Sequence, residues 1–453
     1  MQSSAGVSAS LRILIPVLIS VLLPHSACSS SAPPRRSYSV VDFGAVGDNR
    51  TIDTPAFRAA LAAAAAEATP ESPAWVVVPA PGVYVIGAVN VSSDTTLDVQ
   101  RGAVIRGVRS RDPAQYPVIA PLPSYGTSRD VGYARYQALI MTVPGAQRIR
   151  LTGGGTIDGS GAYWWELFHS KSLEHGRPHL VELYNSSDVT VSNLTLQNSA
   201  FWTLHPVYAR GVHIHDLTIT APEDSPNTDG IDPDSSSNVL IERCSISCGD
   251  DHIAIKSGID AAGRAVNLPS RNITVRRNTH LAGRGISIGS EVSGGVLDVL
   301  IEDTLHLGPS EHGLHIKTSS TRGGFVRNIT YRNVTLGDIV GDAFISLTTS
   351  YGVSTMERDV SPLTEIQGIR YEKIRSTRKI IASDRSVSML SKHATAGIWN
   401  CFEGRPCEDL ELVDVHLTSR GDDDWSCSHV GRNGTRVDDV SPSGLSVCLG
   451  VVD

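Results

Sequence analysis

A short triplet of apolar, variable and apolar residues recurs along most of this chain. Each triplet is followed by a polar residue and a second alternating apolar pair, as in Asn193-Leu194-Thr195-Leu196. Such period-two alternation, bounded by Gly, Asn, Asp and Ser, predicts short strands joined by turns. The triplets are Ile149-Arg150-Leu151, Val189-Thr190-Val191, Val212-His213-Ile214, Val239-Leu240-Ile241, Ile273-Thr274-Val275, Val299-Leu300-Ile301, Ile329-Thr330-Tyr331, Ile369-Arg370-Tyr371 and Leu410-Glu411-Leu412.

The spacing of these triplets predicts how the strands are arranged. Two steps measure 23 residues (189 to 212) and 27 residues (212 to 239), while longer steps, such as 239 to 273, need inserted loops. A repeat of this length predicts a solenoid, in which each circuit buries its inner face by stacking on its neighbours. We therefore expect an all-β protein, a single-domain right-handed parallel β-helix.

Composition supports a turn-rich β protein and excludes one class of partner. The chain has 453 residues with 41 Gly but only 7 Phe and 4 Met, and solenoids of this length need no division into domains. The net charge of −8 argues against nucleic acid as a partner. A polyanionic substrate would have to be bound by a local basic patch.

Three aspartates are placed about one circuit of the predicted solenoid apart. Asn227-Thr228-Asp229-Gly230 supplies the first, and Gly249-Asp250-Asp251-His252 supplies two more 21 residues later. Adjacent strands of a stack lie ~4.8 Å apart, so the three carboxylates would project side by side. They could bind a hard cation such as Ca²⁺, or act as acid and base. An ordinary Asp-Gly turn is the alternative for Asp229 alone.

The motifs that contain these aspartates resemble those of the polygalacturonases, the pectin-cleaving enzymes of glycoside hydrolase family 28. The resemblance covers most of the chain, and no single motif carries it. Further motifs that support it are Asp42-Phe43-Gly44-Ala45-Val46-Gly47-Asp48, Gly289-Ser290-Glu291, Ile316-Lys317-Thr318 and Arg322-Gly323-Gly324.

The resemblance implies an inverting glycosidase and assigns roles to the three aspartates. Asp250 would be the general acid, and Asp229 and Asp251 would activate the water. Inversion needs carboxyl groups ~6.5–9.5 Å apart, which one coil step plus side-chain length can reach. The resemblance also makes Lys317 a group that binds a substrate carboxylate. No cofactor and no metal ion are expected.

Two positions depart from the family pattern. Arg284 stands in Gly283-Arg284-Gly285, where better-studied members have Gly-His-Gly, and His315 replaces the Arg that precedes Ile-Lys. A permanent charge on Arg284 would lower the pKa of nearby carboxyl groups or bind a substrate carboxylate. A solvated turn Arg is the alternative.

Several other residues are candidates for contacts with the substrate. Asn227 belongs to the first aspartate motif, and Lys256 and His252 follow the second, although strand alternation prevents all of them from facing the site. In Asp232-Pro233-Asp234, an inward Asp could support Asp229, although a Pro-Asp turn is the stronger alternative. Aromatic residues that could stack on sugar rings, or simply pack in the core or a loop, are Tyr331, Trp202, Trp164 and Trp165.

The beginning of the chain predicts export. Leu11 to Leu23 is an apolar run too short to span a bilayer comfortably, and small residues follow it, which is typical of a secretory signal. We expect a signal peptide over residues 1–28, a linker over 29–37 and the glycosidase domain over 38–453, opened by a capping helix from Asp53 to Ala68. An uncleaved anchor is the alternative.

Cysteines and glycosylation sequons agree with export. Nearest-neighbour pairing of the six cysteines after Cys28 would join Cys244 to Cys248, Cys401 to Cys407 and Cys427 to Cys448, although sequence cannot fix connectivity. A ladder of stacked asparagines is a competing explanation for the sequons. The sequons begin at Asn49, Asn90, Asn185, Asn193, Asn272, Asn328, Asn333 and Asn433.

The leading interpretation is a secreted, extracellular hydrolase that cleaves α-1,4-galacturonosyl linkages of pectin as a monomer, with no nucleic acid partner and no membrane attachment after signal cleavage. The segment Ala261 to Pro269, inserted after the second aspartate motif, suggests action from chain ends. Two alternatives are a Ca²⁺-dependent pectate lyase with Arg284 as base, and a catalytically silent pectin-binding protein on the same fold.

Overall fold

The computed structural model describes residues 36–126, 134–352, 362–377, 394–418 and 425–443. Residues 35–453 form one compact unit. The expected signal segment lies outside the described residues, as does most of the expected linker, but Arg36 and Ser37 already pair with a strand of the main sheet. In the described part of the chain, no helix combines the length and apolar character needed to cross a membrane.

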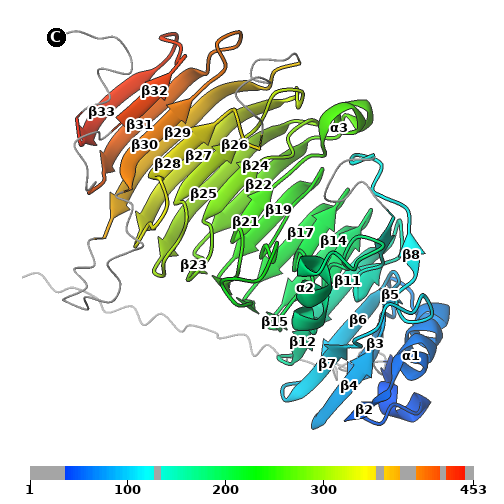
Figure 1. Ribbon diagram of the computed structural model, residues 1–453. Helices are drawn as coiled ribbons and strands as arrows, with labels where there is room; N and C mark the ends of the chain where they lie inside the picture. Colours follow the sequence, from blue (N-terminus) through cyan, green and yellow to red (C-terminus); the bar gives the residue numbers. More distant parts are fainter. Residues whose placement is uncertain (1–35, 127–133, 353–361, 378–393, 419–424, 444–453) are drawn as a thin grey trace, which may run out of the picture. The chain divides into compact units, whose positions relative to one another are not determined.

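The main sheet of this unit has 21 strands, and Figure 1 shows them stacked largely in chain order, from blue to red. Its strands are β1 (Arg36–Ser39), β2 (Asp48–Ile52), β3 (Ala74–Val78), β4 (Gly82–Ile86), β6 (Thr95–Val99), β7 (Ala103–Gly107), β11 (Gln147–Thr152), β12 (Thr156–Asp158), β14 (Ser187–Ser192), β15 (Thr195–Gln197), β17 (Arg210–His215), β18 (Thr218–Thr220), β19 (Ser237–Glu242), β20 (Ser245–Ser247), β22 (Ser270–Arg276), β23 (Thr279–His280), β25 (Val296–His306), β27 (Phe325–Leu336), β29 (Glu365–Ser376), β31 (Glu408–His416) and β33 (Arg436–Ser441).

Two smaller parallel sheets lie on another side of the coil. Ile231 connects them, since it forms a single-residue bridge with Leu204 of the first sheet and another with Ile253 of the second. A short antiparallel pair, β8 (Val118–Ile119) and β9 (Arg135–Tyr136), lies in the long loop between Arg109 and Gln137. The four-stranded sheet holds β5 (Val89–Val91), β10 (Ile140–Thr142), β13 (Val181–Tyr184) and β16 (Leu204–Val207), and the six-stranded sheet holds β21 (Ile253–Ile255), β24 (Ile286–Gly289), β26 (Leu314–Lys317), β28 (Ala343–Thr348), β30 (Thr395–Asn400) and β32 (Trp425–Ser428).

The register of the main sheet confirms the predicted repeat. The first residue of every triplet pairs with the first residue of the next, so the longer sequence steps are loops and not register shifts. Because side chains alternate along a strand, this register places every triplet's outer two residues in the interior. The paired residues, in order, are Ile149, Val189, Val212, Val239, Ile273, Val299, Ile329, Ile369 and Leu410.

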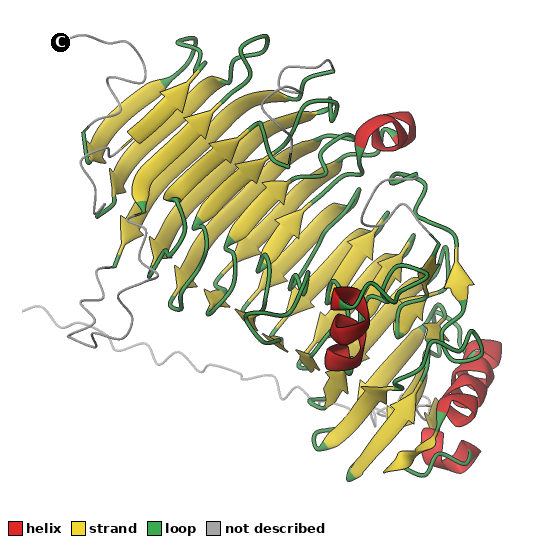
Figure 2. Cartoon of the chain, viewed as in Figure 1, coloured by secondary structure: helices red, strands yellow, loops and turns green. Residues whose placement is uncertain are grey.

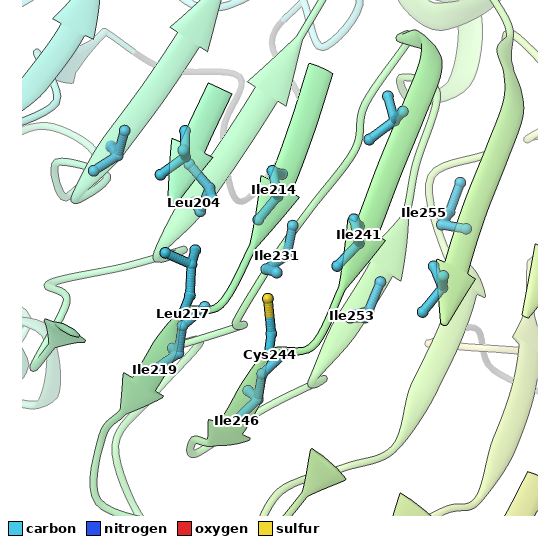
Figure 3. Packing of buried hydrophobic residues seen from close by; sticks show 14 of the residues in the cluster. Leu204, Ile214, Leu217, Ile219, Ile231, Ile241, Cys244, Ile246, Ile253 and Ile255 are labelled. Carbon is cyan, nitrogen blue, oxygen red and sulfur yellow. The ribbon is translucent and has the colours of Figure 1, made fainter. Parts of the chain in front are cut away.

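Columns of like side chains from successive coils form the core. Figure 3 shows Ile214 and Ile241 from the main sheet and Ile231 and Ile253 from the opposite side pointing into the same interior. All four are at most marginally exposed. Full burial of one such side chain stabilises the fold by roughly 1.5–3 kcal/mol, so stacking of coils supplies the main stabilisation.

Three helices accompany the strands (Figure 2). They are α1 (Thr54–Glu67), α2 (Gly161–His169) and α3 (Asp260–Val266), and a 3₁₀ turn, η1, covers Val40–Phe43. The predicted capping helix is α1, whose Phe57 and Leu61 pack into the core. Asp53 is its N-cap residue but does not cap with its side chain, because that carboxylate accepts the backbone N–H groups of Val46 and Gly47.

The nearest-neighbour pairing of the cysteines is only partly confirmed. Cys401 and Cys407 form a disulfide, and Cys427 is disulfide-bonded, while Cys448 lies outside the described residues. The proposed Cys244–Cys248 pair is wrong, since both thiols are free and buried. They flank the three-residue strand β20, and four residue steps along an extended chain separate them by ~13 Å, too far for a disulfide.

Three of the sequon asparagines form ladders between coils, as the competing explanation had it. Asn272 donates its side-chain amide to Asn238, at 2.6 Å. The side-chain amides of Asn328 and Asn333 donate in the same way to aspartates one coil earlier. These contacts give the three asparagines a structural role in their turns.

Candidate active site

The three aspartates lie together at the start of two neighbouring strand segments. Asp229 comes just before the bridging residue Ile231, and Asp250 and Asp251 come just before β21. One carboxylate oxygen from each aspartate lies within 4.8 Å of those of the other two. This limit joins the nearest oxygens, whereas the ~6.5–9.5 Å typical of inverting enzymes separates whole carboxyl groups, so the spacing argument made from the sequence stays a prediction. The nearest oxygens are this close because the aspartates sit on directly stacked coils.

Backbone contacts between the two motifs fix this arrangement. The N–H of Gly230 donates to the carbonyl of Asp251 at 2.9 Å, and the N–H of Gly249 donates to Oγ1 of Thr228 at 2.9 Å. A Cβ atom on Gly249 would lie 2.1 Å from the carbonyl oxygen of Ser225, so only glycine fits there. The turn-forming residues of both motifs are therefore required by the close stacking of the coils.

Asp251 is held in its ionised form. Oδ2 of Asp251 accepts from Nζ of Lys317 at 2.7 Å, and Oδ1 accepts from the hydroxyl of Ser287 at 2.8 Å. Burial opposes ionisation, but the charges of Lys317 and Lys256 and these hydrogen bonds outweigh it and lower the pKa of Asp251. Ser287 was not predicted, since a single Ser on β24 carries no sequence signal.

The pKa values of Asp250 and Asp229 are raised, in contrast to that of Asp251. Burial, followed by the charge of Asp251, raises the pKa of Asp250. Burial and the charge of Asp250 raise the pKa of Asp229 to about 7. Asp232 is wholly buried beside them, and burial raises its pKa well above its ordinary value. The cluster thus holds protonated and ionised carboxyl groups side by side.

Lys256 is the centre of a second buried ionic group. Its Nζ lies 3.2 Å from Glu291, 3.6 Å from Asp229 and 3.7 Å from Asp232. It also lies 4.5 Å above the ring of Trp202. Glu291 was not predicted as a site residue, although it ends the Gly289-Ser290-Glu291 motif. The two lysines sit where a cation would have to bind, which disfavours a metal ion between the carboxylates.

Arg284 reaches the site from the next coil. Its guanidinium lies 3.6 Å from Oδ2 of Asp250 and 3.1 Å from a carboxylate oxygen of Glu311. Burial lowers the pKa of Arg284, but the charges of these two acids outweigh burial and raise it. The alternative of a solvated turn Arg is therefore wrong. Sequence reasoning missed Glu311, which belongs to no motif.

His315 lies beside Lys317 on the same strand and the same face. It pairs with Ser287 of β24, and its ring is 4.4 Å from that of His312. Both ring nitrogens of His315 are buried and lack a hydrogen-bond partner within the described ranges. Asn227 lies on the other side of the aspartates, where its side-chain oxygen accepts from Arg177 at 2.7 Å.

Most of the aromatic candidates are packing residues. Tyr331 is wholly buried and stacks on Tyr371 in the core, and Trp164 is a buried residue of α2. Trp165 donates its indole N–H to the carbonyl of Ser199. Trp202 is buried as well, but it contacts the site through Lys256.

The two sides of the aspartates differ in exposure. Toward the later coils lie Arg284, Glu311 and Tyr351, which are 46%, 47% and 40% exposed. Toward the earlier coils lies a separate buried apolar cluster, into which Ile259, next to α3, also packs. This aromatic wall, as we call it, consists of Leu122, Tyr125, Phe201, Trp202 and Val207.

The long loop and the inserted segment meet at this wall. The hydroxyl of Tyr125 donates to Asp234, and the N–H of Ile259 donates to the carbonyl of Ser124 at 2.9 Å. A Cβ atom on Gly126 would lie 2.9 Å from Cβ of Ala262 in α3. In the part of the chain that the structure describes, half-exposed side chains thus lie near the carboxylates toward the later coils, and the buried aromatic wall lies toward the earlier coils, where Trp202 contacts Lys256.

Comparison with known proteins gives a consistent result. The model of the family "Glycosyl hydrolases family 28" matches residues 77–437. A probable polygalacturonase of Vitis vinifera is 39% identical over 417 residues, which cover 90% of this chain and 79% of that protein. A polygalacturonase of Juniperus ashei is 30% identical over 302 residues, but they cover 65% of this chain and only 55% of that protein.

Solved structures show the same fold. An exopolygalacturonase from Thermotoga maritima has a TM-score of 0.70 at 26% identity, covering 85% of this chain and 87% of that one. A polygalacturonase from Erwinia carotovora has a TM-score of 0.68 at 24% identity, covering 89% and 97%. Right-handed parallel β-helices of this kind confirm the predicted fold class.

Proposed function

Because this chain belongs to glycosyl hydrolase family 28, we propose that it is a glycosidase that hydrolyses the α-1,4-galacturonosyl linkages of pectin. The observation that carries the proposal is the pairing of Asp250, whose pKa is raised, with Asp251, whose pKa is lowered, within one dipeptide. Hydrolysis of a glycosidic bond needs one protonated and one ionised carboxyl group at the same linkage.

We assign the acid role to Asp250 and the base role to Asp251. The side chain of Asp250 is 11% exposed, more than those of the other two aspartates, so it is the one that a glycosidic oxygen reaches most easily. Asp251, kept ionised by Lys317, takes the proton of the attacking water. Asp229 orients that water. Arg284, whose side chain is half-exposed, contacts the substrate, whose carboxylates need cationic donors. The ring nitrogens of His315 are buried, so we assign them no contact with the substrate.

Inversion at the anomeric carbon follows from this assignment, and it can be measured directly. In early ¹H NMR spectra of the reaction, we expect the first product to have the anomeric configuration opposite to that of the substrate. Retention would assign Asp251 or Asp229 as a nucleophile instead.

The main experiment follows products released from polygalacturonate with chelator present. Wild-type protein should release saturated products, and Asp250→Asn should lose about 10²–10⁴-fold of the rate. The matched control is Asp224→Asn, which changes an exposed aspartate shortly before Asp229 in the sequence. It should behave as wild type. Binding without release of reducing ends would instead support the silent pectin-binding protein.

Arg284 does not favour the lyase alternative. A lyase would use it as a base, but its guanidinium is paired with Asp250 and Glu311, which hold it in the charged form. Unsaturated products that absorb in the ultraviolet, lost on addition of chelator, would contradict the hydrolase.

We further propose that the enzyme acts from chain ends. Support comes from the aromatic wall, which contacts the site through Trp202 and Lys256 toward the earlier coils and would stop a polymer from continuing there. The first products should then be of one size, while the viscosity of the polymer falls slowly. A ladder of oligomers with rapid loss of viscosity would show internal cleavage and contradict this assignment.

We propose that the protein acts outside the cell, as a monomeric glycoprotein. Support comes from the disulfide between Cys401 and Cys407, which persists in oxidising compartments, and from the apolar segment at the start of the sequence. Expression in cells of a secreting host, followed by N-terminal sequencing and mass analysis of the medium, tests cleavage, glycosylation and oligomeric state.

A further inference from the structure

His252 directly follows the two aspartates, and its ring lies inside a turn of the next coil. Nε2 is 3.1 Å from the carbonyl oxygens of both Leu281 and Ala282, and Nδ1 is 3.1 Å from the backbone nitrogen of Gly285. Carbonyl oxygens only accept and a backbone N–H only donates, so the ring carries its proton on Nε2. The imidazole therefore bridges both ends of the turn 281–285.

The backbone fits closely around this ring. The N–H of His252 donates to the carbonyl of Gly285 at 2.8 Å, and the N–H of Arg284 donates to the carbonyl of Asp250 at 2.9 Å. A Cβ atom on Gly283 would lie 2.6 Å from Nε2 of His252. A glycine is thus needed at position 283 because the ring approaches the backbone there.

The turn 281–285 carries Arg284, whose guanidinium is 46% exposed and lies between Asp250 and Glu311. A long, half-exposed side chain has many rotamers, and its reach is set by where its backbone is held. Backbone bonds from neighbouring coils also reach the turn, since the N–H of Cys248 donates to the carbonyl of Ala282 and the N–H of Gly283 donates to that of Pro309. Among the described residues, His252 is the one whose side chain hydrogen-bonds the backbone of the turn, so its ring helps to set the position from which Arg284 reaches Asp250.

We propose that His252 is a positioning residue that holds the turn 281–285 in place and thereby sets the contact of Arg284 with Asp250. The proposal extends the proposed function, because it concerns the environment of the general acid. It assigns His252 no contact with the substrate, since the ring is wholly buried.

A metal ion does not explain the ring. His252, His280 and His306 lie close enough together to suggest one, but both nitrogens of His252 are already used by the turn. The rings of His252 and His280 are stacked at 4.6 Å and 8°, so their in-plane lone pairs cannot converge on one ion. His280 and His306 serve as packing for the ring.

The charges that face Asp250 decide the sign of the expected effect. Asp251 and Asp229 are the neighbouring carboxyl groups, and the positively charged groups are Lys317, Lys256 and Arg284. Among them, only Arg284 stands on the turn that His252 holds. Loss of the ring should therefore remove one positive charge from Asp250 and leave the other groups unchanged, so that the pKa of Asp250 rises.

The test compares His252→Leu with a matched control, His280→Leu, which changes a ring of the same stack that has no hydrogen bond to the turn. For His252→Leu we expect kcat/KM to fall about ten- to hundredfold and the basic limb of the pH profile to move to higher pH. For His280→Leu we expect an unchanged profile. Combining His252→Leu with Arg284→Ala should add no further shift, since both act through the same contact.

A second readout is independent of activity. In hydrogen–deuterium exchange, the amides of Arg284 and Gly285 should exchange faster in His252→Leu than in wild type or His280→Leu. His252→Gln keeps a donor at the position of Nε2, and His252→Asn keeps an acceptor at that of Nδ1, so each should restore part of the protection. These two variants take the place of His252→Leu if it does not fold.

The outcomes separate the two proposals. Unchanged exchange in the turn would overturn the role of His252 whether or not the protein is a hydrolase. Faster exchange with a shifted pH profile would support it, and faster exchange with an unshifted profile would overturn the link to Asp250. Faster exchange in a protein that hydrolyses nothing would support the hold on the turn and overturn the proposed function instead.

Discussion

Nζ of Lys317 lies 2.7 Å from Oδ2 of Asp251, and both side chains are buried. The pair keeps Asp251 ionised next to Asp250, which tends to hold its proton. Two identical residues, adjacent in sequence, therefore differ in protonation because only one of them contacts the ammonium group. From the sequence, Lys317 was expected to bind a substrate carboxylate, yet it is already bound to a carboxylate of the protein.

Lys317→Met should destabilise the protein strongly. It leaves Asp251 buried without its counter-ion, and breaking such a pair costs about 3–5 kcal/mol in the free energy of unfolding at pH 7. Urea denaturation measures the change. In the double variant Lys317→Met with Asp251→Asn, the loss should be smaller than the sum of the single losses. Additive losses would show that the two residues do not interact.

The contribution of Asp229 to the stability of the protein should fall as the pH rises from about 4 to about 7. The pKa of Asp229 is raised to about 7, above its ordinary value of ~3.9, so the folded state binds an extra proton between these values. Stability from this group is complete below pH 4 and is lost as the pH rises through 7. Thermal melts across this range measure it.

Asp229→Asn is the comparison for that titration, because it removes the proton-binding group and keeps the shape. As the pH rises over the same interval, Asp229→Asn should gain stability relative to wild type, because the buried histidines, whose lowered pKa values act in the opposite direction, are the same in both proteins. An equal slope in the two proteins would assign the titration to other carboxyl groups, such as Asp250.

Arg284→Ala and Glu311→Gln should move the basic limb of the pH–activity profile in opposite directions. The charge of Arg284 favours ionised Asp250, so its removal raises the pKa of Asp250 and shifts the limb to higher pH. Without the Glu311 charge, the charge of Arg284 acts on Asp250 alone. The pKa of Asp250 then falls, and the limb shifts to lower pH. Profiles of kcat/KM measure both, and a profile unchanged in Arg284→Ala contradicts the assignment.

Tyr331→Phe should be neutral or should stabilise the fold by up to about 1 kcal/mol. The ring of Tyr331 stacks on that of Tyr371 at 4.9 Å, and its buried hydroxyl has no hydrogen-bond partner in the described ranges. The control is Tyr84→Phe, which loses a 2.8 Å hydrogen bond to Pro79 and should cost about 1 kcal/mol. Equilibrium unfolding of both variants gives the comparison, and a large loss in Tyr331→Phe would reveal a missing partner.

Cys244 and Cys248 should be present as free thiols that react only after unfolding. Burial raises the pKa of both thiols, so they are neither exposed nor ionised in the native protein. Alkylation before and after denaturation without reductant, followed by peptide mapping, measures this. Peptides that carry an intact Cys244–Cys248 bridge would contradict the structure.

Much of the fold could be predicted because it depends on local patterns. Apolar residues at alternate positions must face the interior, and a repeat of such segments has one way to bury them, by stacking coil on coil. That rule fixed the register of every triplet from Ile149 to Leu410. It also placed Asp229 beside Asp250 and Asp251, because residues one coil apart become neighbours.

The partners of these aspartates were decided by the tertiary structure. Glu291 and Glu311 reach Lys256 and Arg284 from other coils, and no periodic signal marks them. The same holds for the pairing of His252 with the turn 281–285. Side-chain contacts between coils depend on the path of the turns and on burial. The sequence repeat determines neither of these.

The sequence by itself thus determined the solenoid, its register and the closeness of three aspartates, since strand alternation and coil stacking leave few choices. Only the tertiary structure decided which aspartate is ionised, where the cysteines lie and which side of the site is covered. Those properties depend on distances of a few ångströms between residues far apart in the chain, where burial and neighbouring charge act together.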